Sequence, residues 1–180
     1  MRDSQDPGRP PRGARSVAFL LAQVGSHAAS RFAERLAALD LSPPHAGILR
    51  ALHAGSALSQ QGLGKVLGIL PSRLVILVDE LEERGIVERR DSPDDRRSYA
   101  LHLTRKGEET LEAIGKIARA HEDDVCTALS TDERDVLGTM LRRIAEQQEI
   151  TPGVHPGFRR LGRSSPAEPT RSESKKRRGQ

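Results

Sequence analysis

The sequence predicts a mainly α-helical protein with a small β-hairpin, and two patterns predict this fold class. Between residues 16 and 148, apolar residues recur at the three- and four-residue spacing of amphipathic helices. Residues 86–90 and 97–103 are strand-like instead, with the turn-forming residues 91–95 between them. The chain of 180 residues suits one domain with a tail at each end.

The composition excludes several classes of protein. Hydrophobic residues make up 36% of the chain and charged residues 30%, which is polar for a globular protein. No apolar run approaches the roughly 18 residues of a membrane helix. The single cysteine excludes an internal disulfide and fits a cytosolic protein. We therefore expect a cytoplasmic location and no membrane contact.

Both ends of the chain lack apolar periodicity and are predicted to be disordered, which leaves residues 16–149 as the domain. Residues 1–15 form an arm rich in Pro, Gly and Arg, and residues 150–180 form a basic tail with eight Lys and Arg against two Glu. Because this tail supplies the net positive charge, the rest of the chain is slightly acidic. The local excess at residues 89–106, six basic against three acidic, is the more informative charge pattern.

A long helix is predicted first, from residue 16 to about residue 39. Ser16 is a permitted cap, and Leu20, Leu21 and Val24 begin an apolar stripe with near-helical spacing. The helix is longer than a small core needs. The apolar stripe therefore packs either against a second subunit or against other residues of the same subunit.

Three helices are predicted next. Ser42, followed by two prolines, starts a helix that ends near Gly55. Ser59 caps the second, and Pro71 opens the third, which ends before Gly85, a residue that tolerates a left-handed backbone. The second and third helices, joined by a tight turn within residues 59–84, make a helix-turn-helix.

The third helix carries an apolar stripe that should point inward and leave a polar face outside. The outward residues are Ser72, Ile76, Asp79 and Glu83, with Arg73, Val75 and Glu80 on the flanks. The carboxylates would repel phosphates. A nucleic acid should therefore meet the N-terminal part of this helix, where the helix dipole also favours anions.

The hairpin that follows is basic at its turn, which Arg89, Arg90, Arg96 and Arg97 flank. The alternating residues Tyr99, Leu101 and Leu103 should anchor one face of it. A helix that enters the major groove, followed by a basic hairpin that reaches the flanking backbone, is a known DNA-binding arrangement. The alternative to a DNA-binding role is that this turn is charged only because it faces solvent.

Two helices complete the domain. Thr104 caps one that runs from residue 105 to about residue 129. Ser130 and Glu133 form a capping box for the last helix, which runs to about residue 148.

The hairpin and the helix before it carry a family resemblance. Residues 95–104 match the pattern Asp-x-Arg-x-x-x-Leu-x-Leu-Thr, which resembles the wing signature of MarR-type winged helix-turn-helix regulators. Residues 77–85 resemble the end of that family's recognition helix, and a looser likeness extends over about residues 17–148. The resemblance implies a winged helix-turn-helix, with a DNA-binding part at about 43–104 and N- and C-terminal dimerisation helices at about 16–39 and 105–148.

The resemblance also implies a function. It implies a homodimer that binds double-stranded DNA sequence-specifically and regulates transcription, as a repressor that a small ligand releases. Two-fold symmetry implies a palindromic operator whose half-sites lie about one turn, roughly 10 bp, apart. The effector would be phenolic or another anionic metabolite, and the sequence does not locate its pocket.

Three groups of residues receive roles from the resemblance. The recognition helix would contact DNA through Ser72, Arg73, Val75 and Ile76, although relatives commonly have threonine and arginine at the last two positions. The wing would do so through Arg89, Arg90, Asp95, Arg96 and Arg97, with Asp95 orienting an arginine and either Arg97 or Arg96 entering the minor groove. The dimer would form through Leu20, Leu21, Val24, Leu137, Met140 and Leu141.

Two other classes of function remain for comparison. Val75, Ile76 and the helix acids leave open a winged-helix module that binds protein and has little specific affinity for DNA. An enzyme is not expected, because no acid partner can be assigned to the neighbouring Ser26, His27 and Ser30. Residues 62–64 also lack the lysine spacing of a phosphate-binding loop.

Neither a metal nor another cofactor is expected. His27, His45, His121 and Cys126 could in principle gather at a metal, but the sequence holds no short ligand pair such as His-x-x-x-His. His45 and His121 are expected to be ordinary surface or interface residues. Cys126 is expected to pack as a small apolar group rather than to sense oxidants.

Overall fold

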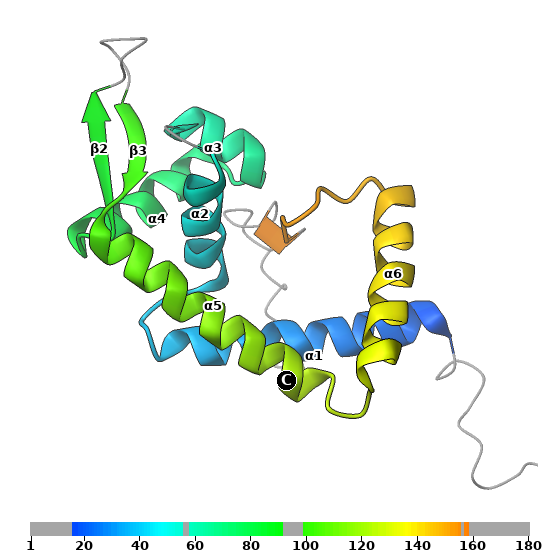
Figure 1. Cartoon of the computed structure of the whole chain (residues 1–180). Helices are drawn as coiled ribbons and strands as arrows, with labels where there is room; N and C mark the ends of the chain where they lie inside the picture. Colours follow the sequence, from blue (N-terminus) through cyan, green and yellow to red (C-terminus); the bar gives the residue numbers. More distant parts are fainter. Residues whose placement is uncertain (1–15, 56–57, 92–98, 156, 159–180) are drawn as a thin grey trace, which may run out of the picture.

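Six helices and three short strands follow one another in the part of the chain that the computed structural model describes, residues 16–55, 58–91, 99–155, 157 and 158 (Figure 1). The helices are α1 (Val17–Ala37), α2 (Pro43–Ala54), α3 (Gln60–Leu67), α4 (Pro71–Glu83), α5 (Arg105–Val125) and α6 (Thr131–Gln147). The strands are β1 (Leu58–Ser59), β2 (Val87–Asp91) and β3 (Tyr99–Leu103). The predicted fold class, mainly helical with a β-hairpin, is confirmed.

One hydrophobic core holds the helix-turn-helix and the sheet together. Its fully buried side chains come mostly from α2, α3, α4 and the strands, and they include Ile48, Leu49, Leu63, Leu67, Leu74, Leu77, Val78, Leu81, Val87 and Leu101. The apolar stripe predicted to point inward from α4 is buried, and it consists of Leu74, Leu77, Val78 and Leu81. Leu36 of α1 and Ile114 of α5 extend this core toward the long helices, which pack on each other.

The sheet has three antiparallel strands in the order β1-β3-β2. Val87 pairs with Leu103 and Asp91 with Tyr99, so β2 and β3 form the predicted hairpin. The sequence did not predict β1, whose two residues pair Leu58 with Leu101 and Ser59 with Ala100. Because β3 lies in the middle of the sheet, both Ala100 and Leu101 are buried.

The role predicted for Tyr99 is wrong. Leu101 is buried and Leu103 half-buried, as an anchoring face requires, but the side chain of Tyr99 is 59% exposed. Tyr99 pairs with Asp91 at the end of the hairpin that points away from the helices (Figure 1). The hydrophobic core does not extend that far. The alternation of apolar residues along β3 therefore continues past the part of the strand that packs on the core.

The start of α5 lies very close to the chain between α4 and β2. The hydroxyl of Thr104 accepts a hydrogen bond from the Gly107 amide at 3.0 Å and donates one to the Gly85 carbonyl at 2.7 Å. A Cβ atom at Gly107 would lie only 2.2 Å from the Ile86 carbonyl oxygen. This close approach fixes where α5 leaves the sheet and runs toward α1 (Figure 1).

The C-terminal segment does not match the boundary predicted at residue 150. Phe158 is buried in the core and Val154 packs against it, while Arg50 donates a hydrogen bond to the Gly153 carbonyl. The aromatic ring lies over Gly47 of α2, where even a Cβ atom would come within 2.8 Å of it. Residues 151–155, 157 and 158 therefore return to α2 (Figure 1). Residues 1–15 and 159–180, for which we predict disorder, lie outside the described residues.

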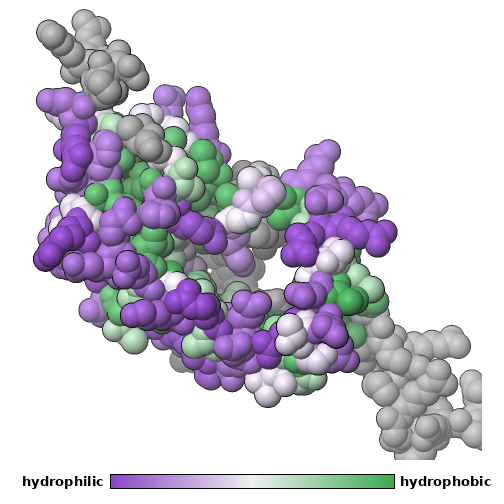
Figure 2. Space-filling view, viewed as in Figure 1, coloured by the Kyte–Doolittle hydropathy of each residue, from purple (hydrophilic) through white to green (hydrophobic). Residues whose placement is uncertain are grey.

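Apolar side chains remain exposed at the two ends of the domain. No residue of α6 is buried, and Leu36 is the one buried residue of α1. Val136, Leu137, Met140, Leu141 and Ile144 all reach the surface of α6, where apolar side chains are visible among polar ones (Figure 2). The described residues of one subunit leave these helix faces exposed.

Candidate nucleic-acid interface

The two helices of the helix-turn-helix meet at a sharp angle. The α3 and α4 axes are bent by 113° across three residues. Gly68 ends α3 with a left-handed φ of 65°, which favours glycine, and the Ile69 amide donates back to the Gly64 carbonyl at 3.2 Å. Ile69 is buried beneath the turn, and Pro71 opens α4. The angle falls within the range of DNA-binding helix-turn-helix units.

The outward face of the first two turns of α4 is open to solvent. Ser72 is exposed, Arg73 is half-buried, and the side chains of Val75 and Ile76 are 39% and 48% exposed. The N-cap residue, Leu70, has no side-chain acceptor for the first amides of the helix. This half of α4 therefore presents a serine, an arginine and two apolar side chains together.

Three acidic residues farther along α4 are paired with cations or hydrogen-bond donors. Asp79 accepts a hydrogen bond from Arg89 at 2.6 Å, and Glu82 forms an ion pair with the same guanidinium. Glu80 contacts the Nε2 atom of His45 at 2.9 Å. The negative charge expected to repel phosphates is thus partly compensated within the domain, and Glu83 remains exposed.

His45 is not the ordinary surface or interface residue that the sequence suggested. Its side chain is buried between the N-terminus of α2 and the middle of α4. The Ser42 amide donates to Nδ1 at 3.1 Å, so the neutral ring must carry its proton on Nε2 and donate to Glu80. Desolvation lowers the pKa of His45, and its bond to Glu80 opposes this only in part. The neutral ring therefore links α2 to α4.

His121, the other histidine expected to be ordinary, lies half-buried on α5 against the ring of Phe32. The two ring centroids are 5.4 Å apart. Burial, followed by the nearby guanidinium of Arg35, lowers the pKa of His121. Cys126 caps the end of α5 and is half-buried.

The described part of the hairpin holds two of the predicted wing residues. Arg89 is half-buried between β2 and α4, and Arg90 is exposed and pairs with Glu88 on its own strand. Asp95, Arg96 and Arg97 lie outside the described residues, so their predicted roles remain predictions. The predicted dimer residues Leu20, Leu21, Val24, Leu137, Met140 and Leu141 are all exposed, on α1 and α6.

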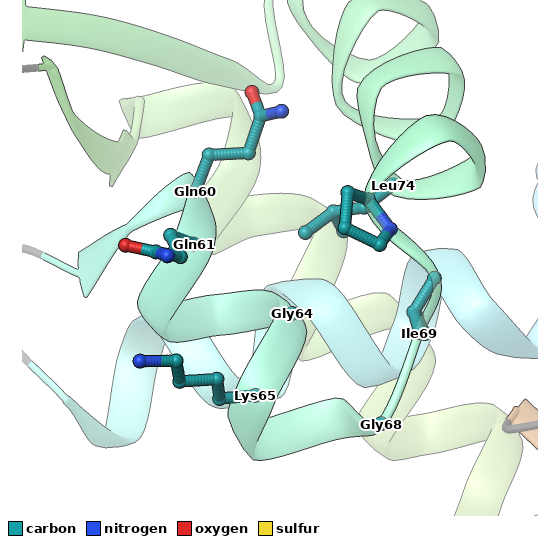
Figure 3. Close-up of a pocket in the computed structure, with 8 residues that line it drawn as sticks. Gln60, Gln61, Gly64, Lys65, Gly68, Ile69 and Leu74 are labelled. Atoms are coloured by element: carbon teal, nitrogen blue, oxygen red, sulfur yellow. The ribbon is translucent and has the colours of Figure 1, made fainter.

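Sequence reasoning missed a second polar surface, on α3. Gln60, Gln61 and Lys65 line a pocket of about 460 Å³ together with Gly68, Ile69, Pro71 and Leu74. Gln61 and Lys65 project to the same side from successive turns of α3 (Figure 3). The signal was present in the sequence, because these residues alternate with the apolar Leu63 and Leu67 at helical spacing.

The described residues bear on two other kinds of site, a metal-binding cluster and a membrane-spanning helix. No group of three or more His, Cys, Asp or Glu side chains among them could hold a metal ion. No single described helix is long and apolar enough to cross a membrane, and the bent pair of α3 and α4 reaches that length and composition only together.

Comparison with known proteins agrees with this architecture. A model of the MarR family matches residues 39–98. The putative transcriptional regulatory protein for the hcr operon of Thauera aromatica is 34% identical over 112 residues, which are 62% of this chain and 68% of that protein. The solved structure of the transcriptional repressor CouR bound to a 23-mer DNA duplex is 34% identical, with a TM-score of 0.66, and the match covers 76% of this chain and 99% of that one.

A more distant structure has the same fold. A mutant MarR from E. coli in complex with operator DNA is 23% identical, with a TM-score of 0.61, and the match covers 71% of this chain and 92% of that one. The bent α3–α4 pair, the adjoining hairpin and the two relatives that are 34% identical all indicate one family. The chain belongs to the MarR family and is a DNA-binding transcriptional regulator rather than an enzyme.

Proposed function

We propose that this regulator is a repressor that acts as a homodimer on a palindromic operator and that a small ligand releases it from DNA. The observation that carries the proposal is the division of α4 into two halves. The first two turns are open and carry no acidic side chain, while Asp79, Glu80 and Glu82 are engaged by Arg89 and His45. Only the first half suits contact with a polyanion.

The contacts to DNA follow from the chemistry of that half. Arg73 can donate to a guanine edge or a phosphate, and Ser72 can donate to either. Ile76 and Val75 can pack against a thymine methyl group. Gln61 and Lys65 project to the same side of α3 (Figure 3), where they could contact the flanking DNA backbone, Lys65 through a phosphate.

The apolar faces of α1 and α6 support the dimer. An isolated subunit would leave Val24, Leu137 and Met140 in water, and such clustered apolar surface marks an interface. A two-fold axis through this interface would present two copies of α4 to half-sites about one helical turn, roughly 10 bp, apart. The homodimer and the palindromic operator therefore belong to one proposal.

One relative supports repression, and ligand release is an expectation from the family resemblance. CouR, which is 34% identical to this chain, is itself a transcriptional repressor. A ligand that separates the two copies of α4 would release DNA, because both half-sites must be contacted at once. A phenolic or other anionic metabolite remains our candidate class.

A gel-shift assay on the DNA upstream of the chain's own gene tests this proposal. The protein should shift one duplex with two chains bound, and a small library of phenolic and other anionic metabolites should contain a compound that reverses the shift. A protein that shifts the duplex as a single chain would contradict the dimer. A shift that no member of the library reverses would remove the support for this class of effector.

A further inference from the structure

We infer that Arg89 acts in DNA binding as a positioning residue, which holds two carboxylates of α4 and the hairpin in one geometry, and not as a phosphate contact. The inference rests on the proposed operator binding and changes the role that the resemblance gives to this arginine. It is carried by the position of the guanidinium between β2 and α4.

The guanidinium of Arg89 spans two side chains one turn apart on α4. Its Nη2 atom lies 2.6 Å from Oδ1 of Asp79, and its Nη1 atom pairs with Oε2 of Glu82. The amide oxygen of Gln60 on α3 lies 3.4 Å from the same Nη2 atom. One side chain of β2 thus contacts both helices of the helix-turn-helix.

The backbone fixes this arrangement from both sides. Arg89 sits opposite Leu101, which is fully buried, so its place along β2 is set by the core. Asp79 and Glu82 are three positions apart and share one helix face, flanking the buried Val78 and Leu81. An arginine fork suits this geometry better than a lysine, because it offers separate N–H groups to the two carboxylates.

Two consequences for DNA binding follow. The carboxylates of Asp79 and Glu82 lie on the helix that enters DNA, where unpaired negative charge would repel phosphates. The ion pairs also tie β2 to α4, so they fix the direction in which the hairpin extends from the recognition helix. Because both terminal nitrogens of Arg89 are already engaged, a phosphate would have to compete with two anions for them.

Removing the carboxylates of Asp79 and Glu82 shows whether Arg89 is a positioning residue or a phosphate contact. The double variant Asp79→Ala/Glu82→Ala removes two negative charges near DNA, so electrostatics alone predicts equal or tighter binding. Our inference predicts that this variant and Arg89→Ala each bind the operator roughly tenfold more weakly, because charge-assisted bonds that set the geometry are lost. The triple variant Asp79→Ala/Glu82→Ala/Arg89→Ala should bind as weakly as the double variant or as Arg89→Ala, since all three changes break the same contact.

The salt dependence of binding gives an independent readout. Loss of one phosphate contact lowers the slope of log affinity against log salt by about 0.9. Arg89→Ala should leave this slope unchanged. Arg90→Ala, which alters the exposed neighbour on the same strand, is the comparison that should lower the slope.

Glu83→Ala is the matched control for removing a carboxylate. Glu83 lies on the same helix at an exposed position, and its removal should leave the affinity equal or slightly tighter. Thermal unfolding of each variant shows whether the fold is intact. If Arg89→Ala unfolds, the operator affinity of Asp79→Ala/Glu82→Ala still shows whether the ion pairs of Arg89 are needed for DNA binding.

The outcomes distinguish this inference from the proposed function. If the parent protein binds its operator and Asp79→Ala/Glu82→Ala binds as tightly or more tightly, the inference fails and the proposed function stands. A lower salt slope for Arg89→Ala would likewise make Arg89 a direct phosphate contact. A parent protein without preference for any duplex would overturn both.

Discussion

At the scale of single residues, His45 shows how a buried polar group can order the helices around it. The Ser42 amide requires a bare Nδ1 atom, and Glu80 requires a proton on Nε2, so the contact uses one tautomer of the neutral ring. Protonation would place an N–H group against the N–H group of Ser42. Arg84 and Arg73 also disfavour the charged ring.

The stability of the domain should therefore fall as the solution becomes acidic. The pKa of His45 is lowered in the folded state, so between its unfolded value of 6.5 and the lower folded value the unfolded chain binds more protons. This contribution to stability is complete above pH 6.5 and is lost as the pH falls toward the folded pKa. His121 has the same direction of shift and adds to the effect.

His45→Gln isolates the contribution of His45. Glutamine completes a capping box with Ser42, so the variant should fold while losing part of the pH dependence. Urea unfolding at about pH 7.5 and about pH 5 measures the change in both proteins. An equal loss of unfolding free energy in the parent and in His45→Gln would show that His45 does not contribute.

Two glycines of α5 should respond to alanine in opposite directions. A Cβ atom at Gly107 would meet the Ile86 carbonyl oxygen, so Gly107→Ala should lower the unfolding free energy by about 1–3 kcal/mol. At Gly115 the nearest atom is Nη1 of the flexible Arg119, 3.6 Å away, so Gly115→Ala should raise it by about 0.5–1 kcal/mol. Denaturant melts of both variants provide the test. Equal effects would contradict the close approach of α5 to the α4–β2 connection.

At the scale of elements, the apolar faces of α1 and α6 stay exposed in the part of one subunit that the structure describes. Met140→Asp places a charge in the middle of the α6 face, where the parent side chain is 54% exposed. If this face joins two subunits, burial of an unpaired carboxylate should dissociate them. Sedimentation equilibrium should then give the monomer mass of 19.7 kDa.

Thr139→Asp is the control for that experiment. Thr139 is exposed and bonds to the Asp135 carbonyl of its own helix, on a different side from the apolar stripe. This variant should remain a dimer. A parent protein that sediments at 19.7 kDa would contradict the proposed interface, because the variants would then have no dimer to dissociate.

Helices were predictable from the sequence because their signals are local. Ser59, Thr104 and Ser130 each accept a hydrogen bond at the start of the helix that they were predicted to cap. The predicted end of α5 was four residues too late, since Cys126 leaves helical geometry at its cap. The strand β1 could not be predicted, because two residues carry no period and pair with a strand more than forty residues away.

Contacts between distant elements limited the prediction of the site. The outward face of α4 followed from helical spacing, as the exposure of Ser72 and Ile76 confirms. Its acids looked unfavourable in isolation because their partners, His45 and Arg89, come from α2 and β2. No pattern within residues 71–84 could reveal these contacts.

At the scale of the whole molecule, the C-terminal segment combines a packed part with a basic one. Phe158 was hidden from sequence reasoning because it is a single aromatic residue in a stretch rich in Pro and Gly, and its partner Gly47 lies more than a hundred residues earlier. Beyond Phe158, the sequence holds eight Lys and Arg and two Glu. The two parts should therefore contribute differently.

Two truncations separate these contributions. A chain that ends at Phe158 should keep its stability and its preference for the operator but bind every duplex more weakly, because it loses only phosphate contacts. A chain that ends at Gln148 should also lose about 2 kcal/mol of unfolding free energy with the burial of Phe158. Titrations and melts of both chains test this. Loss of preference in the chain that ends at Phe158 would show that the basic tail reads sequence.

The most direct test of the account is a fluorescence-anisotropy titration of the full protein against two duplexes. One carries the sequence upstream of its own gene, and the other has the same length and composition in scrambled order. We predict binding of two chains to the first duplex, about a thousandfold or more tighter than to the second, with an affinity that falls linearly in log salt. Equal affinity for the two duplexes across the salt series would contradict sequence-specific regulation by this protein.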